Sequence, residues 1–299
     1  MSFQEQPLWI RSAAEPMLGV LSLPAAADRG LLPHAAVLIV IGGPQYRAGS
    51  HRQFTLIARA LAAAGLAVLR FDHRGAGDSP GEPRSFEELS PDIEAAIAAL
   101  REQIPGLRRI GLLGLCDGAS ASLLYLGSRV GDAPVTALCL LNPWVRSVQS
   151  LARTHVKHYY LRRLLQGGLW AQLLRGRLPL RSLGEFLRSL LKAAGPTSNP
   201  PAPTTGPGGD FRQRMLGALQ GFEGRVLIVA SGLDFVAREF DELTSADSGW
   251  QRALRLAKVR RVALEGADHT FSDPAAQQGL QDELLGFFAP MLEPADAAA

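Results

Sequence analysis

The sequence predicts an α/β fold with a mostly parallel central sheet, helices on both faces of that sheet and an inserted helical cap. Three observations support this prediction. Continuous apolar runs, which are typical of strands covered on both faces, recur along the chain. Segments with helical apolar spacing separate these runs, and such alternation implies right-handed parallel crossovers. From Val145 the alternation breaks, and a basic segment with helical spacing precedes the last strands.

The length and composition suit one sizeable domain with an insertion. The chain has 299 residues, of which 47% are hydrophobic and 20% are charged. Its two cysteines cannot form a disulfide framework, and Cys139 lies in an apolar run, ALCLL, where we expect it to be buried and inert. The N-terminus, MSFQEQPLWIRS, lacks the pattern of an export signal, and no apolar run reaches the ~18 residues of a membrane span. We therefore expect a cytoplasmic protein in a reducing compartment.

The chain opens with a predicted antiparallel hairpin, and a strand–helix–strand unit follows. Two short strand patterns flank a turn at Glu15 and Pro16. The next apolar run, HAAVLIVI, is typical of a strand buried on both faces, so the loop Gly42–Arg47 that follows it is expected at the active edge of the sheet. In chain order, the predicted elements are strands 7–12, 17–23 and 34–41, helix 50–64, strand 67–71, helix 85–103, strand 110–115, a helix after Gly118, strand 135–141, strand 225–230, a helical segment through 250–258, strand 261–264 and a helix from about 274 to 291.

The loop after the strand 67–71, DHRGAGDS, begins like a dinucleotide-binding fingerprint. Pro80 takes the place of the third glycine and no helix opens on the loop, so nucleotide binding is rejected there. Asp72 and Arg74 are expected to form a structural ion pair or to brace the loop. The following helix begins with a capping box at residues 85–88, in which Ser and Glu satisfy the first free backbone groups.

A strand, a sharp turn and a helix are predicted around RRIGLLGLCDGAS, with Cys116 at the turn. Gly114 and Gly118 flank the cysteine at two residues on either side, as a tight strand-to-helix turn requires. This G-x-C-x-G elbow presents its central side chain at the carboxyl end of the sheet, above a helix N-terminus that helps a thiol to ionise. A small buried cysteine in an ordinary turn is the alternative interpretation of the same five residues.

The predicted domain organisation is a core of two parts, 1–144 and 222–299, around a cap insertion, 145–221. The cap includes a loop, 193–210, with five prolines and four glycines, which cannot form regular structure. Between Val145 and Lys192 there are ten Arg or Lys residues and one acidic residue. Such a basic patch is either a solvated helical face or a site for an acidic ligand. The candidates for substrate binding are Arg146, Arg153, Lys157, Arg162 and Arg163.

A cysteine nucleophile needs a base that takes its proton and an acid that orients the base. His269 follows the last predicted strand, and Asp234 follows the strand before it. Both residues are therefore expected at the same carboxyl edge of the sheet as Cys116. The predicted catalytic residues occur along the chain in the order Cys, Asp, His.

Three other residues are weaker candidates for the acid. Asp268 adjoins His269, and adjacent residues rarely have the geometry that lets a carboxylate hold the ring. Asn142 follows another strand, but an amide carries no charge that could stabilise an imidazolium. Asp241 remains a weaker rival.

The oxyanion hole is expected to combine two backbone N–H groups. One belongs to Asp117, directly after the nucleophile, and the other to the loop after the strand 34–41. Pro44 has no N–H, so Gly43 is the best donor in that loop and Gln45 is the second choice. The side chain of Asp117 is either an anion that caps the helix or a second proton handler.

The sequence indicates neither a metal site nor a cofactor. His155 and His158 lie close together in the basic segment, but no third ligand or carboxylate accompanies them. The net charge is +3 and no recognition motif is present, so nucleic-acid binding is not expected either. A homodimer through the cap stays open as an alternative to a monomer.

Several of these motifs resemble known families. GLCDGA at the elbow, DHRGAGDS after a strand, and Asp234 and His269 in late loops resemble the α/β-hydrolase superfamily over nearly all of the chain outside the cap. More narrowly, IGGPQYRAGSHRQF, GLCDGAS, LLNPWVRS, VKHYYL and ADHTFS resemble the exosortase A system-associated hydrolase 1 family. This resemblance implies an α/β-hydrolase fold in a bacterial cytoplasmic protein connected with exosortase and exopolysaccharide gene neighbourhoods. It also implies Cys116 as nucleophile, Asp234 as acid and His269 as base. The cysteine is similar to that of dienelactone hydrolases, which use Cys, His and Asp on this fold.

The chemistry of a thiolate limits the range of substrates. A thiolate attacks well but also leaves well, so its adduct with a poorly activated ester or amide collapses backwards. Activated esters, lactones and thioesters are better matched. The sequence therefore predicts a hydrolase that cleaves a small-molecule ester or thioester, free or carrier-bound, through an acyl-cysteine intermediate. The basic cap could receive a phosphate-bearing carrier, such as a pantetheine arm, or an acidic sugar. An acyltransferase with the same intermediate and a non-catalytic binding protein are the alternatives.

Overall fold

The structure, a computed structural model, describes most of the chain outside the predicted cap. The chain divides into two compact units, residues 1–145 with 208–299 and residues 146–207. The described residues are 3–13, 15–25, 32–43, 45–128, 135–146 and 209–293.

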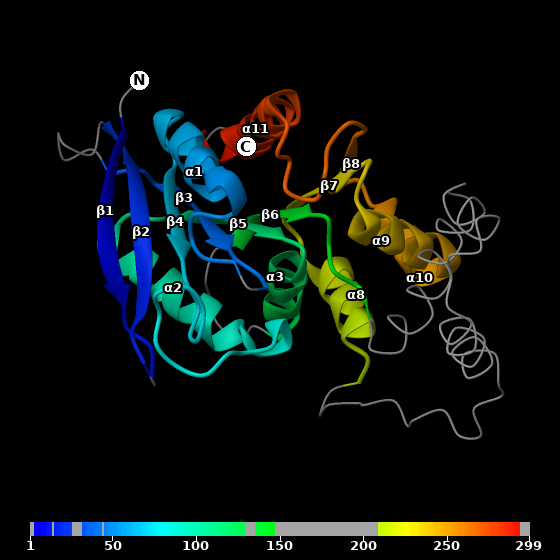
Figure 1. Ribbon diagram of the computed structural model, residues 1–299, viewed down its shortest axis with the longest axis horizontal. Helices are drawn as coiled ribbons and strands as arrows, with labels where there is room; N and C mark the ends of the chain where they lie inside the picture. The colour runs from blue at the N-terminus through cyan, green and yellow to red at the C-terminus, as the bar shows by residue number, and fades with distance from the viewer. Residues whose placement is uncertain are drawn as a thin grey trace, which may run out of the picture. The chain divides into compact units, whose positions relative to one another are not determined.

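An eight-stranded sheet forms the centre of the first unit (Figure 1). Its strands are β1 (Phe3–Ile10), β2 (Met17–Pro24), β3 (Ala35–Val40), β4 (Ala67–Phe71), β5 (Arg109–Leu115), β6 (Val135–Leu141), β7 (Arg225–Ser231) and β8 (Val259–Leu264). The strand order is β1-β2-β4-β3-β5-β6-β7-β8. β1 pairs antiparallel with β2, and β2 with β4, whereas all other neighbours pair in parallel. The predicted parallel sheet with an opening hairpin is confirmed.

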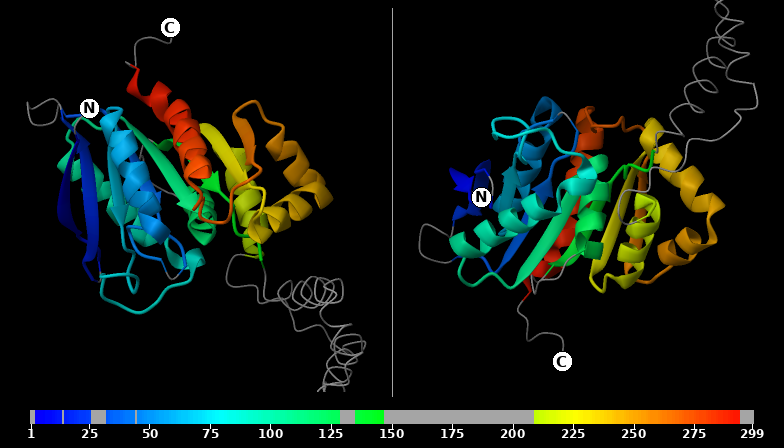
Figure 2. Two further views of the ribbon diagram at one scale, coloured as in Figure 1. Left: turned by 45° about the horizontal axis from the view of Figure 1, so that its top comes forward. Right: turned by 90° about the horizontal axis from the view of Figure 1, so that it is seen from below.

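Helices cover both faces of this sheet (Figures 1 and 2). The α-helices are α1 (Gln53–Ala63), α2 (Ser90–Gln103), α3 (Asp117–Ser128), α8 (Phe211–Gly221), α9 (Phe235–Ala246), α10 (Ser248–Leu254) and α11 (Pro274–Phe288). The 3-10 helices are η2 (Ser50–Arg52), η3 (Phe86–Glu88) and η5 (Ala289–Leu292). α1 and α11 lie on one face, and α2, α3 and α8 lie on the other. This arrangement confirms the predicted fold class.

The central strands contribute side chains to two apolar clusters, one on each face of the sheet. Every residue of β3 and β4 is buried, so successive side chains alternate between the two faces. Leu38 belongs to the cluster that includes Ile93 of α2. Its neighbour Ile39 belongs to the cluster that includes Phe54 of α1 and Phe287 of α11. Each such large side chain contributes about 1.5–3 kcal/mol of transfer free energy on burial, which explains the continuous apolar runs of the sequence.

Helix α8 belongs to the same compact unit as the sheet, although the sequence analysis placed it within the cap segment 145–221. Phe211, Met215 and Leu219 recur every four residues along it and are buried in the core. Because this spacing puts the three side chains on one face of the helix, that face packs toward α3 and the sheet.

Two local differences concern helix starts. The predicted helix 50–64 is divided, because His51 and Arg52 have positive φ angles of 40° and 65° that separate η2 from α1. The predicted capping box is confirmed, but it caps η3 rather than a long helix. The Ser85 N–H donates to the Glu88 carboxylate at 3.1 Å, and α2 begins only at Ser90.

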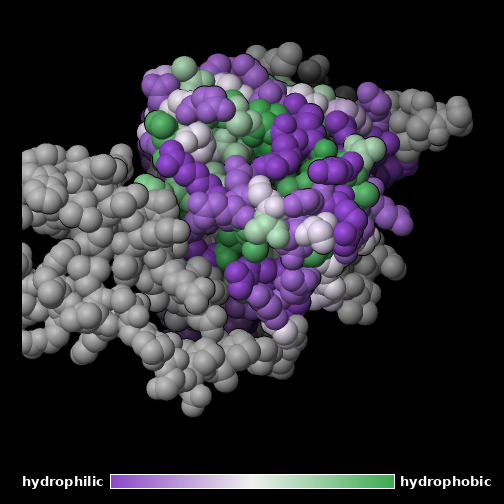
Figure 3. All heavy atoms as spheres, turned by 90° about the vertical axis from the view of Figure 1, so that its right-hand side faces the viewer, coloured by the Kyte–Doolittle hydropathy of each residue, from purple (hydrophilic) through white to green (hydrophobic). Residues whose placement is uncertain are grey.

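The surface around the edge strand β8 is largely hydrophilic, with small apolar patches between polar side chains (Figure 3). Arg260 pairs with Glu283 at 2.6 Å, and Arg261 pairs with Asp241. Charged side chains of this kind protect a sheet edge from pairing with another strand. Within the described ranges, no helix is long and apolar enough to cross a bilayer.

Candidate active site

Cys116 lies at a sharp turn between β5 and α3. Its φ is 59°, an uncommon value for a residue with a Cβ, and its thiol side chain is half-buried. Backbone bonds fix the turn, because the Cys116 N–H donates to Leu141 O at 2.8 Å and the Cys116 carbonyl accepts from the Trp144 N–H at 3.1 Å. Such strain persists only where the surroundings impose it, and it occurs most often at functional sites.

The two glycines of the elbow are required by close backbone contacts. A Cβ on Gly114 would lie 2.4 Å from the carbonyl oxygen of Gly118. A Cβ on Gly118 would lie 2.4 Å from the carbonyl oxygen of Val40. Since neither oxygen can move without its strand or helix, both positions exclude larger side chains. The physical reason that the sequence analysis gave for the G-x-C-x-G spacing therefore holds.

Asp234 and His269 meet at the carboxyl edge of the sheet. Nδ1 of His269 lies 2.8 Å from Oδ2 of Asp234. The Asp234 side chain is only 7% exposed, and it also caps α9 by accepting the N–H groups of Val236 and Ala237. Because Nδ1 faces the carboxylate, Nε2 is the ring nitrogen left for proton transfer. Cys116 packs against the apolar cluster to which Phe271, two residues beyond His269, belongs.

Asn142 braces this edge, a role that the sequence analysis did not recognise. The residue is fully buried directly after β6 and has a positive φ of 45°. Its amide donates to Ser231 Oγ at 2.9 Å and to the His269 carbonyl at 3.2 Å, and its oxygen accepts the Ser231 N–H at 2.8 Å. Asn142 thus ties the end of β7 to the histidine loop. A polar residue at the end of a buried strand was the available signal, but it was weighed only as a candidate acid.

The two other rivals of Asp234 are engaged elsewhere. Asp268 accepts the N–H groups of Thr270 and Ser272 at 3.1 and 2.9 Å, and these bonds shape its own loop. Hydrogen bonding to the Ser272 hydroxyl is the main cause that lowers the pKa of the Asp268 carboxyl. Asp241 pairs with Arg261 on β8. Neither carboxylate orients the His269 ring.

The loop after β3 is held by a buried carboxylate. Asp72, whose side chain is fully buried, accepts both the Arg47 N–H and the Arg47 guanidinium at 2.5 Å. The expected pairing of Asp72 with Arg74 is wrong, because Arg74 instead binds Asp92 of α2. Both residues do brace loops, but with partners from other parts of the chain.

Gly43 and Asp117 lie close to each other at the carboxyl edge of the sheet. The carboxylate of Asp117 accepts the Gly118 N–H at 3.1 Å and lies close to the backbone N–H groups of Gly43 and of Asp117 itself. Burial raises the pKa of this carboxyl, and the three N–H groups and the nearby His73 oppose that rise. The two residues expected to supply the oxyanion-hole donors also line one pocket.

A pocket of about 480 Å³ opens beside these donors. Gly43, Asp117 and Gln45 line it together with His73 and Phe86. Its lining combines apolar and polar groups, as is typical of small-molecule sites. Gln45, the second choice for the oxyanion hole, thus lies at the pocket wall. Within the described ranges, no cluster of three or more His, Cys, Asp or Glu residues could hold a metal ion.

About half of the chain, including the elbow at Cys116, matches a known hydrolase family. The Hydrolase_4 family model, described as serine aminopeptidase S33, matches residues 33–182. The chain belongs to this family. As a Hydrolase_4 protein it is a hydrolase with the α/β-hydrolase fold. The family description names a serine enzyme, whereas the elbow of this Hydrolase_4 chain carries Cys116.

Curated relatives of this Hydrolase_4 protein cover part of the chain. An uncharacterised protein of Mycobacterium tuberculosis, present in strains H37Rv and CDC 1551, is 33% identical over 139 residues. The match covers 44% of this chain and 43% of the relative. The matched region is therefore less than half the length of these curated relatives.

Solved structures resemble the Hydrolase_4 fold over nearly the whole chain. An esterase of Pyrococcus furiosus has a TM-score of 0.63 and 16% identity, with 97% of this chain and 94% of that chain covered. A dienelactone hydrolase of Anabaena variabilis has a TM-score of 0.60 and 15% identity, with 98% and 100% covered. The esterase Est1E of Butyrivibrio proteoclasticus, with ferulic acid bound, has a TM-score of 0.60 and 16% identity, with 94% and 99% covered. At these identities the likeness establishes the fold.

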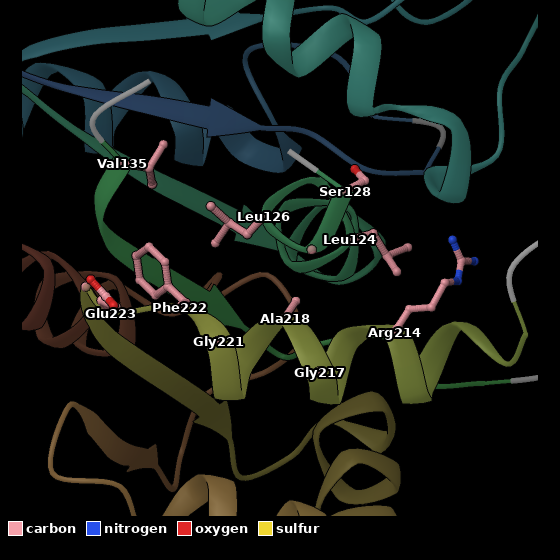
Figure 4. Close-up of a pocket in the computed structure, with 12 residues that line it drawn as sticks. Leu124, Leu126, Ser128, Val135, Arg214, Gly217, Ala218, Gly221, Phe222 and Glu223 are labelled. Carbon is pink, nitrogen blue, oxygen red and sulfur yellow. The ribbon is translucent and has the colours of Figure 1, made fainter. Parts of the chain in front are cut away.

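A larger recess lies away from the site. It has a volume of about 560 Å³ and lies between α3 and α8 (Figure 4). Leu126 and Ser128 line it at the C-terminal end of α3, whereas Asp117 begins that helix. The helix has 12 residues, so its two ends are ~18 Å apart. This recess contains none of the predicted site residues.

Four of the five basic residues that were candidates for substrate binding lie outside the described residues. Arg146 is the last described residue before that segment. The others are Arg153, Lys157, Arg162 and Arg163.

Proposed function

We propose that the protein hydrolyses activated esters or thioesters through an acyl-cysteine intermediate. The observation that carries the proposal is the 2.8 Å hydrogen bond between Asp234 and His269, at the sheet edge where the strained elbow presents Cys116. A nucleophile, a base and an oriented acid on the loops after β5, β8 and β7 form the constellation that acyl transfer needs.

The proposed reaction begins when the Cys116 thiol gives its proton to Nε2 of His269 and its sulfur attacks the substrate carbonyl. The carbonyl oxygen becomes an oxyanion that accepts the N–H groups of Gly43 and Asp117. The C–O or C–S bond to the leaving group then breaks, and the imidazolium returns its proton to that group. Water attacks the acyl-cysteine with His269 as base, which releases the acid and restores the thiol. Asp234 stabilises the imidazolium in both halves.

The cysteine favours activated substrates. When the tetrahedral adduct collapses, either the thiolate or the leaving group of the substrate departs. The leaving group must therefore depart at least as readily as the thiolate does. Thioesters, aryl esters and lactones meet this condition, whereas amides do not. A carrier-bound thioester would add a phosphate, which Arg146, Arg153, Lys157, Arg162 and Arg163 of the basic segment could bind. Reversing two of these charges should then weaken the binding of acidic substrates and reduce its salt dependence.

The proposal extends to the biological setting. The sequence motifs that resemble the exosortase A system-associated hydrolase 1 family support a cytoplasmic role connected with exosortase and exopolysaccharide genes. Deleting the gene and measuring the exopolysaccharide of the strain tests this role. Unchanged amount and composition of the polymer would remove it.

Mass spectrometry of the intact protein tests the chemistry. The protein is mixed with p-nitrophenyl esters and acyl thioesters, and the acylated peptide is then identified. We expect an acyl group on Cys116 that is lost in the Cys116→Ala and His269→Ala variants. Cys139→Ala is the matched control, because burial raises the pKa of that thiol and keeps it unreactive. Absence of any Cys116-dependent adduct would favour a non-catalytic fold, and transfer of the acyl group to an added alcohol would favour an acyltransferase.

A further inference from the structure

The side chain of Asp117 occupies the place that the proposed reaction assigns to the oxyanion. Its carboxylate accepts the Gly118 N–H at 3.1 Å and lies close to the backbone N–H groups of Gly43 and of Asp117, the two expected oxyanion donors. The carboxylate lies directly against the loop after β3. A Cβ on Gly42 would lie only 1.8 Å from Oδ1 of Asp117, so a glycine at that position is what allows this contact.

A carboxylate and an oxyanion cannot use these donors together. Each N–H group has one proton to donate, and each of the two acceptors carries a negative charge. A second anion at the same donors would face the charge of the first in a largely buried place, where screening by water is weak. The hole must therefore be vacated or its occupant neutralised before a tetrahedral intermediate can form.

We propose that the Asp117 carboxylate is a built-in occupant of the oxyanion hole, which holds the protein in a low-activity state until the carboxylate is protonated or displaced. This inference rests on the proposed function for its catalytic consequence, whereas the contact of the carboxylate with the loop is independent of that function. Burial raises the pKa of the carboxyl, so protonation occurs above its ordinary range.

The surroundings of Asp117 provide a place for the displaced side chain. The 480 Å³ pocket adjoins both Asp117 and Gly43. The charged or titratable groups that face Asp117 from the described part of the chain are His73 after β4, Arg84 before η3 and the adjacent thiol of Cys116. The loop after β3 contributes only backbone and the neutral Gln45 at this point. A carboxylate that turns into the pocket therefore meets two basic side chains.

Amide NMR tests the occupancy without any substrate. The protein is labelled with ¹⁵N, and the N–H signals of Gly43 and Gly118 are followed as the pH changes. We expect both signals to titrate with one common midpoint above the ordinary range of an aspartate, and to stop titrating in Asp117→Asn. A Gly43 signal that does not titrate with Asp117 would overturn the inference.

Kinetics tests the consequence. The ratio of kcat/KM between Asp117→Ala and wild type, measured with one activated ester, largely cancels the pH effects that the two proteins share. Freeing the oxyanion donors is expected to raise this ratio to about tenfold at neutral pH, below the 10²–10³ that a single donor can contribute. The ratio should fall toward one as the pH decreases through the midpoint seen by NMR. Asp117→Asn keeps a neutral acceptor, so its ratio to wild type should lie between one and the ratio of Asp117→Ala.

Asp241→Asn is the matched control, since its carboxylate pairs with Arg261 and not with the loop after β3. Its ratio should stay near one at every pH. A ratio below one, or one independent of pH, for Asp117→Ala would overturn the inference. Titrating amides without Cys116-dependent turnover in any variant would refute the proposed function and leave the occupancy standing. Cys116-dependent turnover without titrating amide signals would refute the occupancy and leave the proposed function standing.

Discussion

Replacing Asp234 by Asn removes one charge from the proposed site at nearly constant side-chain size. Asparagine is as good a helix cap as aspartate, although it keeps only one oxygen that can accept an N–H group at the start of α9, from Val236 on Oδ1 or from Ala237 on Oδ2. Two unit charges about 4 Å apart interact by about 4 kcal/mol at an effective dielectric constant of 20. The His269 side chain is 34% exposed, and this screening reduces the expected loss to about 2–3 kcal/mol. We therefore expect kcat/KM to fall by about 30- to 160-fold.

Stopped-flow acylation with a p-nitrophenyl ester measures this loss, and thermal unfolding checks the fold. Asp273→Asn is the matched control, because Asp273 caps α11 as Asp234 caps α9 and makes none of the contacts described at the site. The control should keep the wild-type rate. A loss in Asp234→Asn of less than about threefold, with an unchanged melting temperature, would refute a role for the carboxylate in stabilising the imidazolium.

Three further substitutions test the supports of the site. Asn142→Ala removes three buried hydrogen bonds, so urea unfolding should show a loss of about 2–4 kcal/mol, and a loss below about 0.5 kcal/mol would contradict the brace. Gly114→Ala brings a methyl group against backbone and should cost about 3 kcal/mol in the same assay, whereas an unchanged midpoint would contradict the close contact. The raised pKa of Asp117 means that the stability contributed by this group is present below its unfolded pKa and is lost as the pH rises through the folded pKa. Asp117→Asn should therefore gain stability relative to wild type between about pH 3 and pH 7, and thermal unfolding with an equal difference at both pH values would refute this.

The common carboxyl edge of parallel strands explains why the proximity of Asp234 and His269 could be predicted from the sequence. Parallel strands end at a common edge, so a residue that follows a strand can be assigned to that edge before its partners are known. The buried runs that became β7 and β8 were strong enough to locate those ends. The same reasoning located Cys116, because the two glycines of its elbow mark where the strand must turn.

Hydrogen-bond and ion-pair partners that lie on different loops could not be predicted in this way. Asp72 binds Arg47, which is 25 positions away, and Asn142 reaches His269 across 127 positions. The sequence places these residues near the edge, but the direction of each side chain depends on loop backbone angles such as the positive φ of Asn142. A pairing of Asp72 with the nearby Arg74 was the natural expectation from spacing, and packing of Arg74 against Asp92 of α2 prevents it.

The start of α3 must satisfy two opposed demands. A helix N-terminus leaves N–H groups without intrahelical partners, and the Asp117 carboxylate accepts one of them, that of Gly118. The proposed reaction needs one of these groups, with Gly43, for an oxyanion. If both demands apply, Asp117→Ala should gain activity and lose stability, because the helix start loses its acceptor. Asp117→Asn should keep the acceptor without the charge, so its stability should not fall with that of the alanine variant. A parallel loss of stability in the two variants would contradict the capping role of the side chain.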